Sequence, residues 1–441
     1  MNKIPEVSRL SFLKSARAIL KNPLPFHKKN FNLKGNTFRL KLGILKDVVF
    51  SRDAMFAQHV LQKNQKNYKK SAIQTKDLAK YVGNGLLTSN GAHWAKQRKL
   101  IQPAFHKKQL ETLVNKIQEA ILTEIEKIEV DQPFNIFPVF NDLAFQTVVK
   151  ALFSGEVDTR AINRLQYITE AAQEMLVKEL RQPYLNWWFK LSGELEKNLA
   201  LTREARDILN DFVAKRRQSG KRYDDLLDML LDARYDNGLA MDDEQLIDEI
   251  LILFTAGHET TSNALTFAAE LLARNPSIQD KIYSEVITLK DEDDLLLKLK
   301  GLQYTEQVIN ETMRLYPPAY FIDRVSIESD AFSDFEIKPN TNLLFSIYEI
   351  HRDENYFKDS EVFNPDRFED KTIKYSPYYY PFGAGPRMCI GNNFAMYEMI
   401  LTIYELMKVY KIEYKSSPIE IKPLITLKPK NAILQFSKRK D

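Results

Sequence analysis

The longest helical pattern in the chain covers residues 241–275, and this stretch constrains the fold more than any other. Asp242 or Asp243 has a side chain suited to cap its N-terminus, and Asn275, followed by a proline, ends it. Roughly 33 residues with a rise of about 1.5 Å each give a rod of about 50 Å. A rod of this length crosses a whole domain, so we expect the protein to be built around it.

The middle of this helical pattern is polar and contains a glycine. Gly257 weakens a helix by about 1 kcal/mol relative to alanine, and it follows the apolar run of residues 250–254, so we expect a local bulge here. Glu259 and Thr260 place an acid beside a hydroxyl, a pairing suited to proton transfer. The alternative is a tolerated glycine with a threonine that bonds back to a carbonyl.

The only cysteine of the chain, Cys389, lies in a glycine-rich stretch, residues 381–391, directly before another helical pattern. Backbone N–H groups at such a turn and helix N-terminus favour a thiolate. The alternative is a buried, inert thiol. One thiolate cannot complete a zinc or iron–sulfur site, which needs about four protein ligands. It suffices for haem, because the porphyrin supplies the other four donors.

The spacing Phe382-Gly383-x-Gly385-x-Arg387-x-Cys389-x-Gly391 resembles the haem-binding loop of the cytochrome P450 family. Three further motifs of that family occur in the same order along the chain: Trp94 with Arg98, the run Ala256-Gly257-His258-Glu259-Thr260-Thr261, and Glu311 and Arg314 with Arg367. The resemblance extends from about residue 30 to the end. The chain looks like a soluble, bacterial-type member, similar to the haem domain of bacterial fatty-acid hydroxylases and to the P450s of marine Bacteroidetes.

The resemblance implies a mainly α fold with small β-sheets, in which haem b lies between the long central helix and the cysteine loop. We expect a single haem domain over residues 1–441, with a β-rich portion at about 30–70 and 320–350 and no fused reductase. Residues 38–42 and 46–51 read as strands joined by a turn at Gly43, and residues 53–61 read as a helix.

The resemblance also assigns roles to individual residues. Cys389 would be the iron ligand, and the other haem-binding residues would be His93, Trp94, Arg98, Ala256, Thr260, Arg324, Phe382, Gly383, Arg387 and Gly391. Thr260 and Glu259 would be catalytic, with Glu259 feeding protons toward the hydroxyl of Thr260. Glu311, Arg314 and Arg367 would form a structural network that fixes the cysteine loop.

The implied reaction is monooxygenation, in which one oxygen atom of O2 enters a C–H bond of a small organic substrate. Electrons would come from a ferredoxin or flavodoxin with its NAD(P)H-dependent reductase. Lys96, Lys99, Lys107 and Lys108 would form a basic docking face for such an acidic partner. A peroxygenase driven by H2O2 and a non-catalytic haem sensor are the alternatives, and the intact pair Glu259–Thr260 argues against both.

Composition limits the partners and the compartment. The net charge, 63 − 59 = +4, argues against nucleic acid, and one cysteine excludes an internal disulfide framework, so we expect a cytoplasmic monomer. No stretch approaches the roughly 20 apolar residues that span a bilayer. The amphipathic N-terminal pattern of residues 1–23 is expected to pack on the protein itself rather than on a membrane.

The sequence leaves two substrate classes open. One is fatty acids, by general resemblance, and the other is a methylated sugar that undergoes oxidative O-demethylation. Arg181 and Gln182 beside Tyr184, Trp187 and Trp188 would suit a sugar. Because adjacent tryptophans cannot share a helix face, at least one should line a surface or a cavity. The pocket itself would be covered by residues 71–87 and shaped by residues 160–200.

Overall fold

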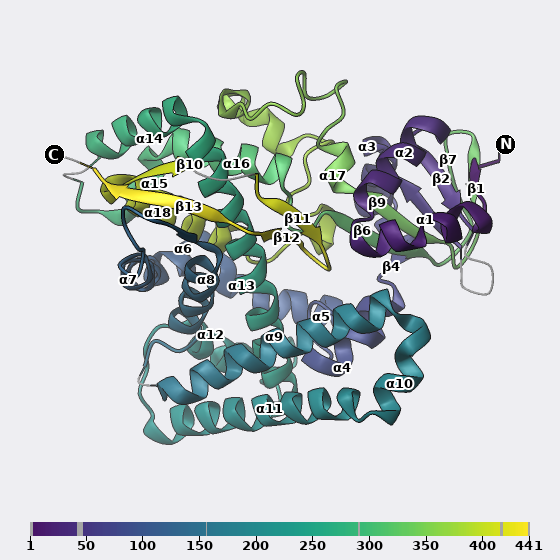
Figure 1. The fold of residues 1–441 in the computed structure, drawn as a ribbon. Coiled ribbons are helices and arrows are strands. Elements are labelled where there is room, and N and C mark those ends of the chain that lie inside the picture. Colours follow the sequence, from purple (N-terminus) through teal and green to yellow (C-terminus); the bar gives the residue numbers. More distant parts are fainter. Residues whose placement is uncertain (1–2, 42–46, 156, 290–291, 415–417, 440–441) are drawn as a thin grey trace.

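The computed structural model describes residues 3–41, 47–155, 157–289, 292–414 and 418–439 (Figure 1). The predicted turn at Gly43 lies outside these residues. Helices dominate the described chain and short strands form small sheets, so the predicted fold class is confirmed. No helix in the described ranges combines the length and the apolar composition needed to span a bilayer.

The α-helices of the described residues are α1 (Arg9–Lys21), α2 (Leu24–Lys34), α3 (Ala54–Gln58), α4 (Ala79–Val82), α5 (Gly91–Ile101), α6 (Lys107–Leu110), α7 (Val114–Ile125), α8 (Phe137–Leu152), α9 (Thr159–Arg181), α10 (Asn186–Leu191), α11 (Glu194–Ser219), α12 (Leu226–Asp232), α13 (Asp243–Arg274), α14 (Pro276–Thr288), α15 (Leu295–Gly301), α16 (Gln303–Leu315), α17 (Ile347–Ile350) and α18 (Asn392–Val409). Short 3-10 or π-helical segments are η1 (His59–Lys63), η2 (Gln65–Asn67), η3 (Ile73–Leu78), η4 (Gln102–Phe105), η5 (Glu111–Leu113), η6 (Pro183–Leu185), η7 (Pro365–Glu369), η8 (Lys371–Tyr375) and η9 (Gly385–Arg387).

The strands of the described residues are β1 (Glu6–Val7), β2 (Thr37–Leu40), β3 (Val48–Ser51), β4 (Tyr68–Lys69), β5 (Pro133–Asn135), β6 (Phe321–Ser326), β7 (Asp330–Phe332), β8 (Phe335–Ile337), β9 (Asn342–Ser346), β10 (Tyr410–Tyr414), β11 (Glu420–Pro423), β12 (Leu427–Lys430) and β13 (Ile433–Lys438). The largest sheet has the order β1-β2-β3-β9-β6-β4, and it lies with α1 and α2 at one end of the molecule (Figure 1). Smaller sheets are β10-β13-β5, β11-β12 and β7-β8.

The long helix α13 runs through the centre of the molecule and begins where the sequence predicts. The side chain of Asp242 caps it by accepting a hydrogen bond from Gln245 N at 2.8 Å, and Asn275 ends it. The prediction of a bulge at Gly257 is wrong, because α13 is a continuous α-helix through this position. Packing explains this: a Cβ on Gly257 would lie 2.9 Å from Val148 of α8, so the glycine permits close helix contact without a change of helix type.

Other local predictions need small corrections. The strand predicted at residues 38–42 is β2, which starts one residue earlier and pairs antiparallel with β3. The helix predicted over residues 53–61 is α3, capped by the side chain of Asp53, and it continues as the π-helical η1. Residues 64–68 contain η2 and the start of β4, which pairs with β6.

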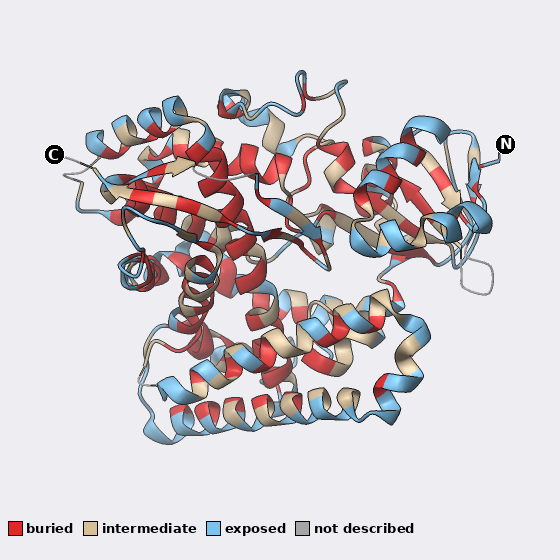
Figure 2. Ribbon diagram, viewed as in Figure 1, coloured by how far each residue is buried: buried red, intermediate tan, exposed pale blue. Residues whose placement is uncertain are grey.

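Helices α9, α10 and α11 form a layer at one side of α13 (Figure 1). Figure 2 shows that the outer faces of α9 and α11 are exposed, while α13 is buried along most of its length. Both Trp187 and Trp188 of α10 lie on the surface, 63% and 49% exposed, so neither lines the core. The N-terminal helix α1 packs Phe12 and Ile19 on the protein, as expected, but leaves three of its leucines exposed.

Candidate active site

The cysteine loop folds back on itself so that Cys389 lies at the start of α18. Cys389 N donates to Phe382 O at 2.9 Å, and Gly383 N donates to Tyr380 O at 3.1 Å. Gly385 has φ +69°, and a Cβ there would lie 2.0 Å from Leu61 O of η1. Only glycine fits this contact, because the backbone is left-handed and touches another backbone. The loop is therefore fixed by its own backbone hydrogen bonds and by its contact with η1.

The thiol of Cys389 is surrounded by protein although its side chain remains accessible. Burial raises its pKa, and this effect outweighs the backbone N–H of Gly391 and the positive charge of Arg98, which both lower it. The expected N–H donor to sulfur is thus present, but it does not by itself produce a thiolate. A coordinated metal ion deprotonates such a thiol outright.

Helix α5 places two basic or aromatic side chains against the cysteine loop. Arg98 donates through Nη1 to Met388 O at 2.8 Å and through Nε to Gln102 at 3.0 Å. The ring of Trp94 lies under the guanidinium of Arg387, with 4.1 Å between the guanidinium carbon and the ring centroid. His93 does not join them, because its Nε2 donates to Asn84 O at 3.0 Å.

Three cations from distant parts of the chain meet beside this loop. Arg387 lies near Arg324 of β6, and their mutual repulsion adds to burial in lowering the pKa of Arg387 to about 10. Burial and the charges of both arginines lower the pKa of Lys70 to about 7. Among the described residues, the one carboxylate that influences Lys70 is Asp323, whose oxygens already accept from Ser71 N and Gln74 Nε2.

This cation cluster fits haem b. Buried charges are costly unless they are paired, and the cluster of Lys70, Arg324 and Arg387 carries more positive charge than the single Asp323 offsets. Haem b brings two propionate carboxylates, which would balance the excess. With one thiol at the start of α18 to ligate iron and this cluster to receive propionates, the donor set suits a haem.

The middle of α13 offers an accessible face inside an otherwise buried helix. Ala256 is exposed and Thr260 is half-buried, one turn apart, while His258 and Glu259 are buried. The Thr260 hydroxyl donates to Ala256 O at 2.8 Å. A hydroxyl that donates backward keeps its lone pairs for a water molecule or ligand. Small and hydroxylic side chains thus line the one face of this stretch that is open.

Glu259 connects this face with the surface through a lysine. Its Oε1 lies 3.9 Å from Nζ of Lys428, a half-buried residue of β12. His258, between Gly257 and Glu259, points into the core, where its Nδ1 donates to Phe254 O at 2.9 Å, and burial lowers its pKa. His258 is therefore a neutral core histidine, while Glu259 lies near a partly exposed lysine.

Glu311, Arg314 and Arg367 meet as the sequence motif implies. Glu311 holds Arg314 by two hydrogen bonds of 2.7 and 2.8 Å, with both side chains fully buried, and Nε of Arg367 lies 3.4 Å from Glu311. Arg314 also donates to the carbonyls of His351, Ser360 and Val362. This network ties α16 to the loop that leads to the cysteine.

His351 extends the network to the cysteine loop. Its Nε2 accepts from Tyr380 N at 2.8 Å, and Nδ1 donates to Arg314 O at 3.2 Å. Burial and the charge of Arg314 lower the pKa of His351 to about 3, so the ring is neutral. Tyr380 in turn accepts from Gly383 N, at the first glycine of the loop.

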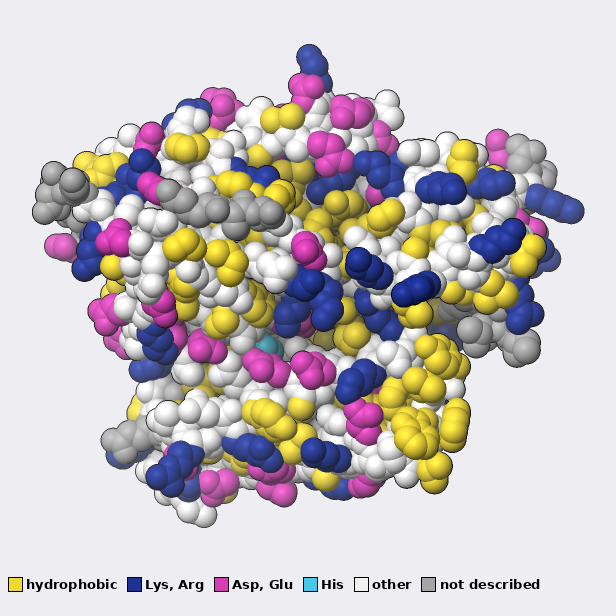
Figure 3. Space-filling model, viewed as in Figure 1, with side chains coloured by type: hydrophobic (Ala, Val, Ile, Leu, Met, Phe, Trp, Pro, Cys, Tyr) yellow, Lys and Arg dark blue, Asp and Glu magenta, His cyan; other side chains and the backbone are white. Residues whose placement is uncertain are grey.

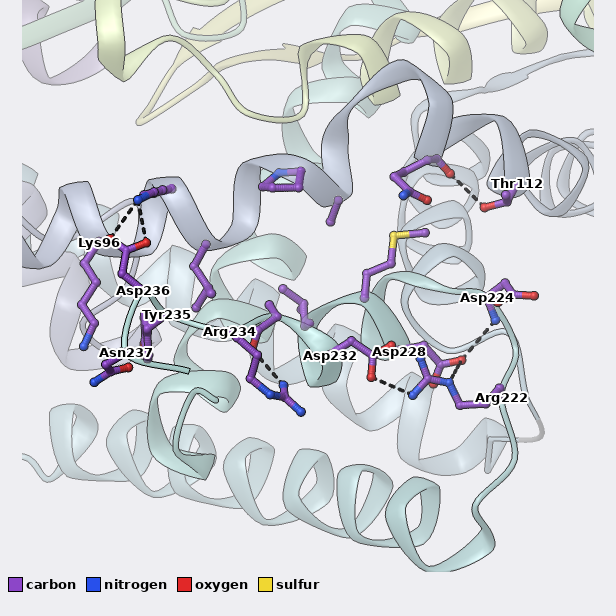
Figure 4. A pocket seen from close by; sticks show the side chains of 18 of the residues that line it. Lys96, Thr112, Arg222, Asp224, Asp228, Asp232, Arg234, Tyr235, Asp236 and Asn237 are labelled. Atoms are coloured by element: carbon purple, nitrogen blue, oxygen red, sulfur yellow. Dashed lines mark hydrogen bonds and ion pairs between the residues drawn. The ribbon is translucent and has the colours of Figure 1, made fainter. Parts of the chain in front are cut away.

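The expected basic docking face is less basic than the sequence suggests. Lys99 pairs with Asp236 at 2.6 Å, and Lys96 lies over the ring of Tyr235 at 3.7 Å. Lys107 and Lys108 remain exposed. Beside them a groove of about 910 Å3 runs between α5 and residues 222–237 (Figure 4). The groove is lined by both lysine or arginine and aspartate residues, so the expected docking face carries positive and negative charges side by side.

The residues that would suit a sugar do not converge on a pocket. Nη1 of Arg181 donates to Leu20 O at 2.8 Å, and its Nη2 donates to Pro423 O, so the guanidinium joins α1 and β11 to the end of α9. Tyr184 is 62% exposed, like the tryptophans that follow it. Figure 3 shows hydrophobic side chains gathered over α10 on this face of the molecule.

Sequence reasoning missed Lys70 altogether. It lies two residues after Tyr68 in a lysine-rich stretch, where no local pattern separates it from Lys66 or Lys69. Only the pairing of β4 with β6 carries it to Arg324. Asp248 and Glu249 were also missed, although two acids within a buried stretch of helix are a signal that the sequence offers.

Comparison with known proteins gives a consistent result. A family model described as Cytochrome P450 matches residues 5–436. Cytochrome P450 4d2 of Drosophila melanogaster is 29% identical over 422 residues, which cover 88% of this chain and 83% of the relative. Cytokinin hydroxylase of Arabidopsis thaliana is 28% identical over 380 residues, 82% of this chain and 73% of the relative. Cytochrome P450 4V2 of Pongo abelii is 28% identical over 400 residues, which cover 83% of this chain and 76% of the relative.

Proposed function

The chain belongs to the cytochrome P450 family, and from this premise we propose that it hydroxylates an apolar organic substrate at a C–H bond. As a member of this family it is a monooxygenase, and its cofactor is haem b with a thiolate-bound iron. When bound, the haem supplies the redox chemistry that activates O2. The protein contributes binding, orientation and protons.

The observation that carries the proposal is the donor set around Cys389. Cys389 would ligate the iron, and Lys70, Arg324 and Arg387 would hold the two propionates. Arg98 would remain on the cysteine loop through Met388 O, close enough for its charge to act on the sulfur. Within the part of the chain that the structure describes, Asp323 is the one carboxylate that acts on Lys70 and Arg324, which is why we assign the three cations to an anionic cofactor.

Glu259 and Thr260 would carry protons toward the reacting oxygen. Glu259 lies 3.9 Å from the partly exposed Lys428, and Thr260 is accessible on the open face of α13. Proton transfer by a relay needs each group within reach of the next, directly or through one water. A peroxygenase or a haem sensor would have no need of such a path, so the adjacent Glu259 and Thr260 support a monooxygenase.

For the substrate we favour a fatty acid over a methylated sugar. The guanidinium of Arg181 is occupied by two backbone carbonyls, which removes the main polar group that would suit a sugar. The exposed side chains Tyr184, Trp187, Trp188 and Leu191 instead give the α10 region an apolar surface, over which an apolar substrate would approach. The relative named cytokinin hydroxylase supports hydroxylation as the reaction type.

The redox partner would be a separate ferredoxin or flavodoxin with its reductase. Exposed Lys107 and Lys108 of α6, together with Arg98 of α5 on the cysteine loop, would provide the remaining positive charge. We also propose a cytoplasmic monomer, since the lone cysteine forms no disulfide. A soluble bacterial type, like the P450s of marine Bacteroidetes, stays a prediction, because the relatives above come from an insect, a plant and an ape.

A titration of the purified ferric protein tests the proposal. Long-chain fatty acids and O-methylated monosaccharides are added separately, and the low-spin to high-spin shift of the Soret band is recorded. We expect a saturable shift with fatty acids. A shift with the methyl sugars alone would refute the apolar substrate and predict formaldehyde release on turnover. A starting spectrum without thiolate character would refute the role of Cys389.

A further inference from the structure

Two neighbouring carboxylates of α13 lie directly beneath the turn of residues 83–86. Asp248 Oδ2 accepts a hydrogen bond from Asn84 N at 2.6 Å, and Glu249 Oε2 accepts one from Leu86 N at 3.0 Å. Both carboxylates are buried, with exposed fractions of 5% and 1%. Burial of charged groups is costly, so two of them beneath one turn indicate that the turn needs a fixed position.

The glycines of this turn confirm how closely the carboxylates approach it. A Cβ on Gly83 would lie 2.0 Å from Asp248 Oδ1, and one on Gly85 would lie 2.7 Å from Glu249 Cδ. Gly83 also has φ +82°, which favours glycine. The backbone of the turn therefore rests on the carboxylates without an intervening side chain.

The turn leads to the acceptors of Arg387. Ser89 Oγ donates back to Gly85 O at 2.7 Å. The next groups, Ser89 O and Asn90 Oδ1, accept hydrogen bonds from Arg387 at 3.0 and 3.2 Å. No ion pair joins Arg387 to a carboxylate among the residues that the structure describes, so the position of its guanidinium depends on this turn and on the ring of Trp94.

We propose that Asp248 and Glu249 are positioning residues, which hold Arg387 in place for a haem propionate through the turn of residues 83–90, and that protonation of Glu249 weakens this hold. The proposal rests on the proposed function, because it requires that Arg387 binds a haem propionate. Asp248 acts as the permanent anchor, since its other oxygen pairs with Arg206 of α11.

Glu249 is the part of this arrangement that responds to pH. Its two oxygens accept from Leu86 N and from Gln245 Nε2, the latter at 2.9 Å. Burial, with a contribution from the charge of Asp248, raises the pKa of Glu249 to about 7. A protonated carboxyl group keeps one good acceptor oxygen and gains a donor. One of the two N–H groups then loses its acceptor.

The charged and titratable groups around Glu249 come from several elements. They are Asp248 on α13, Arg206 on α11, Tyr235 and Asp242 on the segment before α13, and His93 on α5. His93 donates to Asn84 O through Nε2. Among these groups, Glu249 is the one whose carboxylate accepts directly from Leu86 N.

Glu249→Gln should reproduce the protonated state at every pH, because the amide has one acceptor oxygen and an NH2 group in place of the other. The measurement is the rate at which the holoprotein transfers haem to excess apomyoglobin, followed by the Soret band between pH 6 and pH 8. The parent should release haem about fivefold faster at pH 6 than at pH 8, the effect of one lost hydrogen bond. The variant should release it at the faster rate throughout.

Arg387→Gln and the double variant show whether Glu249 acts through Arg387. Arg387→Gln alone should speed haem release at least tenfold, the effect of a lost charge-assisted bond. An unchanged rate would refute the role of Arg387 in the proposed function. If the single variant behaves as expected, adding Glu249→Gln should change little. Additive effects, or a pH dependence that persists in Glu249→Gln, would overturn the inference.

Glu244→Gln is the matched control, since Glu244 is exposed on the first turn of the same helix. It should release haem at the parent's rate at each pH. General loosening of the fold would raise the release rate of Glu249→Gln without removing its pH dependence, so the pH profile separates a positioning role from a merely structural one.

Discussion

Glu398 is a fully buried carboxyl group, and we expect its proton to control the stability of the protein across neutral pH. It lies on α18, nine residues after Cys389. Its Oε1 accepts from the hydroxyl of Thr147 on α8, and its Oε2 has no hydrogen-bond partner among the described residues. Burial raises the pKa of Glu398 to about 8, and only the bond from Thr147 opposes this.

The size of the effect follows from the difference between the folded and unfolded pKa values. The ordinary pKa of a glutamate is 4.5, so the unfolded chain loses this proton first as pH rises. Stability is therefore lost as pH rises from about 4.5 through 8, and it levels off above that. Each pH unit corresponds to about 1.4 kcal/mol. Between about pH 5.5 and pH 7.5 the loss is about 2.5 kcal/mol.

Glu398→Gln removes the titration and keeps the shape of the side chain. The thermal midpoints of parent and variant holoproteins are compared at pH 5.5 and pH 7.5. An unfolding entropy of about 2 cal/mol/K per residue converts 2.5 kcal/mol to about 3 °C for a chain of this length. The parent should therefore fall about 3 °C relative to the variant between the two pH values.

Comparison within one pair of proteins isolates Glu398, because every other titratable group is common to both. Glu119→Gln, at an exposed position of α7, measures what the same chemical change does at the surface. A parent-to-variant difference that is equal at both pH values would refute the reasoning, since it would mean that burial does not hold the proton on Glu398.

Three further predictions concern the active site. Gly385→Ala should abolish haem loading, because the new Cβ would lie 2.0 Å from Leu61 O. The control is Gly35→Ala, which should load haem normally, because Gly35 also has a positive φ but no atom lies within 4 Å of its Cβ position. Equal Soret absorbance of the two variants would contradict this prediction. Glu311→Gln leaves the buried Arg314 without its counter-charge and should cost about 3–5 kcal/mol, seen as a lower thermal midpoint; an unchanged midpoint would contradict it. Charge reversal at Lys107 and Lys108 should raise the KM for an acidic redox partner several-fold at low salt, with little change in kcat, and an unchanged KM would place the docking face elsewhere.

The local elements were well predicted where their signals are local. The cap at Asp242 and the stop at Asn275 depend on side chains within one turn of the helix end, so the bounds of α13 agree with the sequence. The spacing of Glu311 and Arg314 fixes their contact in the same way, since residues three apart share a helix face. The bulge expected at Gly257 failed because the decisive neighbour, Val148, belongs to another helix.

The partners of Arg181 could not be predicted for a similar reason. Its neighbours in sequence are aromatic and polar, which suggested a sugar pocket. Its actual partners are Leu20 O and Pro423 O, 161 and 242 residues away. A long side chain takes the partners that tertiary structure offers, and the sequence around it does not contain them.

The sequence by itself determined the chemistry of this protein and the tertiary structure decided its electrostatics. Cys389 within its glycines, and Glu259 beside Thr260, are recognisable because adjacent residues form each motif. The cation cluster of Lys70, Arg324 and Arg387 exists only because strand pairing and the cysteine loop bring three distant segments together. The raised pKa values of Glu249 and Glu398 arise only from burial. Burial and charge balance are properties of the surroundings of a residue, and those surroundings form only when the chain folds.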